Sequence, residues 1–200
     1  MPEAGSLSAL PVILSFFQPA PDRAAPTRRD NIVSLMKMIR LKDAQRHDKK
    51  ATELAEAKDW AGAREEFVMA ASLYEAQEAV DLQAKMLSAA ALCDFALGRL
   101  PEALASLRRS ADLMASVKDV EGEATVILES GHVLLKLGRA DEAEAAYERA
   151  LRLFRSEDNH DGLVRVYRGL ENLFRSKCDD AKAEEMRDRC EAARRLLAAE

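Results

Sequence analysis

The sequence predicts an all-α solenoid of four antiparallel helical hairpins, preceded by an N-terminal helix and a flexible tail. A turn-like segment recurs along the chain, so that its last alanine appears at Ala63, Ala103, Ala143 and Ala183, 40 residues apart each time. A fixed period in this range is typical of stacked repeats. Helix breakers are scarce, since proline occurs after residue 27 only at Pro101. Aromatic residues make up only 5% of the chain and charged residues 32%, which suits long solvated helices.

Charge and cysteine content narrow the class of protein. The net charge of −5 and a pI near 5.4 argue against a general nucleic-acid binder, which needs basic residues to neutralise phosphates. The three cysteines, Cys93, Cys178 and Cys190, are an odd number and form no CxxC pair. This favours reduced thiols, and therefore a cytoplasmic location, over a disulfide framework.

Residues 1–29 are expected to be a flexible tail. The segment 7–17 is apolar, but Glu3 precedes it without any Lys or Arg, Pro11 interrupts it, and it is too short to span a bilayer. A cleaved signal peptide is therefore disfavoured. Two alternatives stay open: a tail without a role, or a short peptide that docks on a partner, on the repeats or on a membrane surface through Leu14, Phe16 and Phe17.

Residues 30–200 are expected to form the helical domain, with repeats at about 43–79, 80–119, 120–159 and 160–200. Asp30 or Asn31 can cap the first helix, and Ile32, Leu35, Met36 and Ile39 give it an apolar stripe. Whether this helix continues into the first repeat stays open. The four hairpins are predicted at 43–57 with 61–75, 80–97 with 101–117, 120–137 with 141–154, and 161–177 with 179–199.

The turns have the expected chemistry. Gly98 and Gly138 can adopt the left-handed conformation that ends a helix. Pro101 suits a first helical turn, where its missing amide hydrogen costs nothing. Asp59, Asp141 and Asp179 are placed to cap the helices that follow.

Small residues stand where paired helices must approach closely. Ala51, Ala91 and Gly131 on the first helices face Ala63, Ala103 and Ala143 on the second, and bulky residues follow at Phe67, Leu107 and Tyr147. In this respect residues 43–200 resemble the tetratricopeptide repeat family, in a subclass with a 40-residue period, which implies a right-handed superhelix. The fourth repeat departs from the pattern at Glu171, Cys178 and Arg187. Its last helix has an inward stripe of Ala183, Met186, Cys190, Ala193 and Leu197 and a polar outer face, as a terminal repeat should.

The resemblance implies that the first helices of successive hairpins line a groove that binds a protein partner. The groove positions carried over to this sequence are Lys85, Ser88, Leu92, Phe95, Ala96, Thr125, Leu128, His132, Leu135, Lys136, Arg165, Arg168, Asn172 and Arg175. Such a groove would be apolar in its middle and basic toward its C-terminal end, which suits an acidic helix or extended peptide. Alternatively, the arginines are an ordinary solvated helix face, paired with Asp161, Glu171 or Asp179.

A second, narrower resemblance is to the soluble NSF attachment proteins. It is carried by residues 57–60 with Phe67, and by Phe16 and Phe17, which match a membrane-touching diphenylalanine loop. This resemblance implies a membrane-trafficking adaptor.

No enzymatic chemistry is predicted. His47, His132 and His160 fall in different repeats, and the sequence contains no HExxH motif, phosphate-binding glycine loop or GxSxG turn. We therefore expect neither a catalytic site nor a metal or other cofactor. The expected function is a protein-binding scaffold or adaptor, as a subunit of a larger cytoplasmic, cytoskeletal or ciliary assembly.

Overall fold

The structure, a computed structural model, describes residues 28–198, which form helices joined by short turns and include no strand. The predicted docking residues Leu14, Phe16 and Phe17, and most of the predicted tail, lie outside the described residues. The chain divides into two units, Met1–Met36 and Lys37–Glu200. The eight described helices are α2 (Arg28–Glu56), α3 (Trp60–Glu75), α4 (Val80–Ala96), α5 (Leu100–Ser116), α6 (Val120–Lys136), α7 (Ala140–Ser156), α8 (His160–Ser176) and α9 (Asp180–Leu197).

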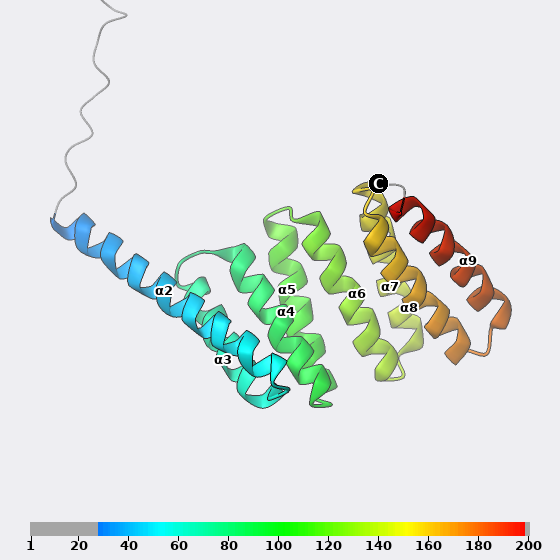
Figure 1. Ribbon diagram of the computed structural model, residues 1–200, viewed down its shortest axis with the longest axis horizontal. Coiled ribbons are helices and arrows are strands. Elements are labelled where there is room, and N and C mark those ends of the chain that lie inside the picture. The colour runs from blue at the N-terminus through cyan, green and yellow to red at the C-terminus, as the bar shows by residue number, and fades with distance from the viewer. Residues whose placement is uncertain (1–27, 199–200) are drawn as a thin grey trace, which may run out of the picture. The chain divides into compact units, whose positions relative to one another are not determined.

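The helices from α3 onward begin at intervals of 20 residues, so one 40-residue repeat consists of two helices. Figure 1 shows them as successive antiparallel helices, each beside the next. The predicted hairpin boundaries agree with these helices to within two residues, apart from the start of α2. The expectation of an all-α repeat fold is confirmed.

All seven turns share one geometry, in which the residue two positions before the next helix has a positive φ. Gly98 and Gly138 have φ of 76°, as predicted. In the other five turns, residues with side chains take this conformation, at φ between 51° and 62°: Lys58, Glu78, Lys118, Asp158 and Cys178. The residue that follows each of them donates its amide hydrogen to a carbonyl five residues back, as Asp59 does to Leu54, which satisfies the free carbonyls at the helix end.

Two of the three predicted helix caps are confirmed. The carboxylate of Asp59 accepts a hydrogen bond from the amide of Gly62, and that of Asp179 accepts one from Lys182. The third was wrong, because Arg139 holds the N-cap position of α7 and Asp141 lies in the first turn. A carboxylate there still stabilises the positive end of the helix dipole.

The predicted seams between paired helices are buried. The six alanine and glycine positions facing one another are enclosed, as are Phe67, Leu107 and Tyr147. Gly131 shows why a small residue is needed, because a β-carbon added there would lie 2.6 Å from Cε1 of Tyr147. The ring of Tyr147 also abuts Gly169, so glycines on α6 and α8 let the second helix α7 pack between them.

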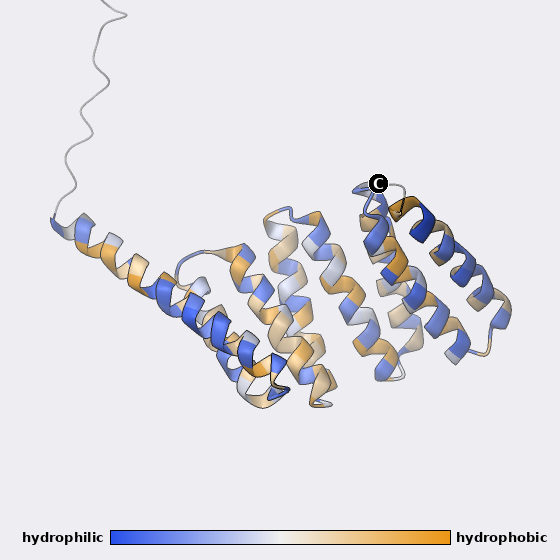
Figure 2. Cartoon of the chain, in the orientation of Figure 1, coloured by the Kyte–Doolittle hydropathy of each residue, from blue (hydrophilic) through white to orange (hydrophobic). Residues whose placement is uncertain are grey.

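The last helix covers the end of the array with a polar surface. Ala183, Met186, Cys190 and Ala193 are buried against α8, while the rest of α9 is largely charged, as its blue colour in Figure 2 shows. The prediction for Leu197 was wrong, since 40% of it is exposed. Cys190 lies at the level of Val164, near the start of α8, so α9 runs past the end of its neighbour before reaching Leu197.

Helix α2 begins at Arg28, two residues before the first predicted cap, and is one helix as far as Glu56. Ala44 and Ala51 are buried, and His47 and Lys50 both bond to Glu66 of α3. Large apolar side chains in the N-terminal half of α2 are exposed by 36% to 54%, namely Ile32, Val33, Leu35, Met36, Met38, Ile39 and Leu41. Among the described helices none is long and apolar enough to cross a membrane.

Candidate peptide-binding face

The first helices of three successive hairpins, α4, α6 and α8, form one layer. Helix α6 contacts α8 directly. Between α4 and α6 the hydroxyl of Ser88 donates a hydrogen bond of 2.8 Å to the carboxylate of Glu129. We call the accessible side of this layer the first-helix face.

Most of the predicted groove residues have accessible surface on α4, α6 or α8. Lys85, Leu92, His132, Arg168, Asn172 and Arg175 are exposed, and Ser88, Phe95, Thr125, Leu135 and Arg165 are half-buried. Leu128 is the exception. It is completely buried in the main hydrophobic core, so it cannot touch a partner. Because α6 has neighbours on several sides, its buried arc extends to Leu128, which helical periodicity alone did not reveal.

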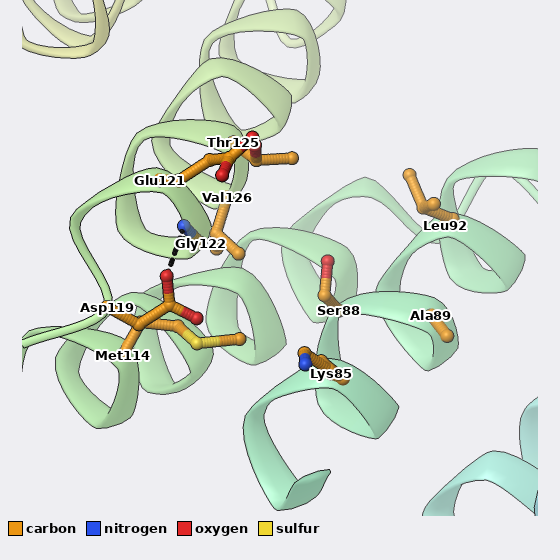
Figure 3. Close-up of a pocket in the computed structure, with 10 residues that line it drawn as sticks. All are labelled: Lys85, Ser88, Ala89, Leu92, Met114, Asp119, Glu121, Gly122, Thr125 and Val126. Atoms are coloured by element: carbon orange, nitrogen blue, oxygen red, sulfur yellow. Dashed lines mark hydrogen bonds between the residues drawn. The ribbon is translucent and has the colours of Figure 1, made fainter. Parts of the chain in front are cut away.

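A cleft of about 470 Å³ opens between α4 and α6, above α5. Figure 3 shows residues of α4 on one side of it and the first turns of α6 on the other. Ala89, Leu92, Met114 and Val126 give it apolar walls. The other lining residues are polar, charged or glycine: Lys85, Ser88, Asp119, Glu121, Gly122 and Thr125.

Sequence reasoning found Lys85, Ser88, Leu92 and Thr125 in this cleft but missed its other lining residues. Asp119 and Gly122 do mark a helix start, since the carboxylate of Asp119 accepts a hydrogen bond of 2.8 Å from the amide of Gly122. That signal predicts a cap. It does not reveal that the first turn of α6 faces the middle of α4, because this depends on how the hairpins stack.

Glu129 is a further residue of the face that the sequence reasoning missed. It is half-buried between α4 and α8, and burial raises the pKa of its carboxyl group; the hydrogen bond from Ser88 and the charge of Arg165 act in the opposite direction. The equivalent positions in the neighbouring repeats hold Ala89 and Gly169. A carboxylate between two such small residues is the signal that could have identified it.

His132 packs by its ring edge on Tyr147, with ring centroids 5.5 Å apart at 61°. Although His132 has accessible surface, the surrounding protein partly desolvates the imidazole and lowers its pKa, and the nearby charge of Arg165 lowers it further. The neutral ring is therefore the dominant form at neutral pH, so His132 contributes aromatic surface to the face and no positive charge.

The three arginines of α8 differ in their surroundings. Arg175 donates to Glu171 one turn earlier at 2.6 Å, so for this residue the ordinary helix-face interpretation holds. Among the described residues, neither Arg165 nor Arg168 belongs to an ion pair, and the expected pairing with Asp161 or Asp179 is not formed. The positive charge available to a partner is therefore that of Arg165 and Arg168.

In residues 28–198 no three His, Cys, Asp or Glu side chains are grouped so that they could hold a metal ion. Phosphate or cofactor recognition likewise has no glycine-rich loop to support it in the sequence.

Comparison with known proteins places the fold. Residues 122–195 match the family model for the tetratricopeptide repeat, over the two repeats that form the C-terminal half of the face. Over this stretch the chain is similar to the tetratricopeptide repeat, and its array of paired helices supports that assignment. Repeats of this family generally mediate protein–protein interaction, and proteins built from them are typically scaffolds without enzymatic activity. No curated protein matches the sequence.

Solved structures of tetratricopeptide-like proteins resemble this one at low sequence identity. Aspartyl phosphate phosphatase F from Bacillus subtilis superposes with a TM-score of 0.74 at 15% identity, over 80% of this chain and 42% of that protein. BtubC (BKLC) from P. vanneervenii gives 0.55 at 21% identity, over 80% and 74%, and MamA gives 0.50 at 16%, over 75% and 97%. This chain thus spans less than half the length of the phosphatase, and at these identities the likeness concerns the fold alone.

Proposed function

We propose that this protein is an adaptor that binds an acidic peptide or helix of a protein partner on its first-helix face. The observation that carries the proposal is the placement of two arginines without ion pairs, Arg165 and Arg168, on the same face as an apolar cleft. The assembly it would serve is cytoplasmic, and a cytoskeletal or ciliary complex is the form we favour.

The physical basis is complementarity between a groove and a peptide. An apolar side chain of the partner would fill the cleft beside Leu92 and Val126, since burying apolar surface drives association. Guanidinium groups bind carboxylates in a two-pronged geometry, so an acidic residue of the partner would meet Arg165 or Arg168. Both contacts lie on first helices, which the repeat fold holds rigidly in register.

The test compares two charge reversals on α8. The full chain is used for affinity capture from the source cells, followed by mass spectrometry. The double variant Arg165→Glu, Arg168→Glu should lose the partner. The variant Arg175→Glu is the matched control, because Arg175 is already paired with Glu171, and it should retain the partner. Circular dichroism verifies that both variants keep their helical content.

Equal capture by the wild type and the double variant would exclude this face as the binding surface. Loss of capture in Arg175→Glu alone would show that the partner binds the C-terminal turn of α8 and not Arg165 and Arg168.

A membrane-trafficking adaptor of the attachment-protein kind is the second candidate. It is favoured by the exposed apolar side chains of α2, such as Met38 and Ile39, which alternate with Lys37, Arg40 and Lys42. Apolar residues combined with basic ones suit an anionic lipid surface. Vesicle flotation tests this: if the wild type and a Phe16→Ser, Phe17→Ser variant float equally poorly, the lipid function is excluded.

A further inference from the structure

The first-helix face carries a negative charge at its centre, between the cleft and the arginines. The carboxylate of Glu129 accepts a hydrogen bond from Ser88 of α4, which also lines the cleft. The positive charge of Arg165 on α8 also acts on this carboxylate. No ion pair within the described residues includes Glu129, although 35 acidic and 30 basic residues are present in the chain. The cleft beside α4, the carboxylate of Glu129 on α6 and the arginines of α8 therefore follow one another across the first-helix face.

Glu129 is connected to the cleft through Ser88, which lines the cleft and donates its hydroxyl hydrogen to the carboxylate. On α4 the equivalent residue is Ala89, which has only a methyl side chain, whereas on α8 the equivalent Gly169 is buried and packs on the ring of Tyr147. Ala89 itself lines the cleft. A partner chain in the cleft would therefore approach the carboxylate from the α4 side, where Ala89 puts no bulky side chain in its way.

We propose that Glu129 is a specificity-determining residue, which pairs with a lysine or arginine of an extended peptide bound across the first-helix face. This inference rests on the proposed function and adds to it the charge pattern of the ligand. This half-buried carboxylate has one hydrogen bond, from a neutral hydroxyl, and the charge of Arg165 acts on it from beyond ion-pair distance, so a ligand cation in direct contact would compensate it further.

The spacing of the ligand groups follows from helix packing. Neighbouring packed helices lie roughly 8–10 Å apart, and an extended chain advances about 3.3 Å per residue. The peptide would thus carry an apolar side chain for the cleft and, close to it, a basic residue for Glu129, since Ser88 belongs to the cleft and bonds Glu129. It would carry an acidic residue about three positions further for Arg165 or Arg168 on the packed neighbour α8. Its charge pattern is mixed, which distinguishes it from a uniformly acidic ligand.

The experiment is selection of a displayed library of random peptides on the full chain, in parallel for wild type and Glu129→Gln. Glutamine keeps the size and the acceptor oxygen of the side chain but removes its charge. Wild type should enrich peptides with the apolar–basic–acidic order. Glu129→Gln should enrich peptides with the same apolar and acidic positions and no basic preference.

Calorimetry on one selected peptide completes the test as a double-mutant cycle. Exchanging its basic residue for methionine should weaken binding to wild type by about tenfold or more, the effect of losing a charged partner from a partly buried pair. The same exchange should cost Glu129→Gln little. Equal losses on both proteins, or an unchanged basic preference in the Glu129→Gln selection, would overturn the inference while leaving the groove intact. If neither protein enriches any peptide, the groove function falls as well.

Discussion

Replacing Arg64 by leucine should destabilise the protein by about 3 kcal/mol, because it removes the short hydrogen bond to a buried carboxylate. Arg64 of α3 donates from Nε to Oδ1 of Asp94 on α4 at 2.6 Å, and Asp94 is completely buried. Breaking a buried ion pair by removing one partner typically costs about 3–5 kcal/mol. We expect the lower end, because Arg64 is 32% exposed and Arg99 remains 3.8 Å from the same oxygen.

The next repeat shows what could replace this pair. Forty residues further along the chain, the equivalents of Arg64 and Asp94 are Leu104 and Leu134, both buried in the main core. The double variant Arg64→Leu, Asp94→Leu therefore copies an arrangement that the fold already uses. Exchanging a buried ion pair for packed apolar residues is often neutral or stabilising by about 1–4 kcal/mol, so the double variant should be at least as stable as the wild type.

Chemical unfolding followed by circular dichroism measures these differences, and thermal unfolding gives an independent value. For a chain of this size, 1 kcal/mol corresponds to about 2–4 °C in Tm, so Arg64→Leu should melt roughly 6–12 °C lower than wild type. Wild-type stability of Arg64→Leu would refute the reasoning. So would a double variant less stable than Arg64→Leu, because it would mean that the leucines cannot pack there.

Three further predictions concern other parts of the molecule. Chemical unfolding should show that Gly131→Ala lowers the free energy of unfolding by about 1–3 kcal/mol, because the added β-carbon would press on Tyr147. Gly98→Asn should lower it by about 1 kcal/mol or less, since no atom lies within 4 Å of an added β-carbon and five other turns place residues with side chains at a positive φ. Burial raises the pKa of Glu129 above its ordinary value of 4.5, so the folded state favours the protonated carboxyl group and loses stability as the pH rises and the group becomes charged. The Tm of Glu129→Gln should therefore match that of wild type below pH 4.5 and exceed it increasingly toward neutral pH. A Tm difference that does not change with pH would contradict this. Of the three cysteines only Cys178 is exposed, and burial raises the pKa of the Cys93 thiol. A thiol reagent should therefore modify one cysteine quickly in the native protein and all three after unfolding. Rapid modification of Cys93 in the native protein would show that the seam between α3 and α4 opens.

Local signals in the sequence were sufficient for the architecture. The 40-residue period, the small residues at the seams and the capping aspartates each depend on contacts between neighbours in the chain or between paired helices, so they can be recognised from spacing alone. Gly131 is an example: the same glycine that fits the repeat pattern also contacts the ring of Tyr147. The failures were local as well. Asp141 was displaced from the cap by two residues, and Leu197 lay beyond the cover of α8.

The site required the stacking of one hairpin on the next. Rotamers, and the choice of which helices face each other, decide which arginines form ion pairs. Within the described part of the chain, they leave Arg165 and Arg168 without an ion pair and pair Arg175 with Glu171. The same holds for Leu128, which the resemblance to the tetratricopeptide repeat family placed in the groove and which the surrounding helices enclose. The sequence by itself determined that this protein is a stack of helical hairpins, because that is encoded in short-range spacing. Only the tertiary structure decided where the cleft opens, and that Glu129 stands between it and the arginines, because those positions are set by residues about 40 apart on different helices.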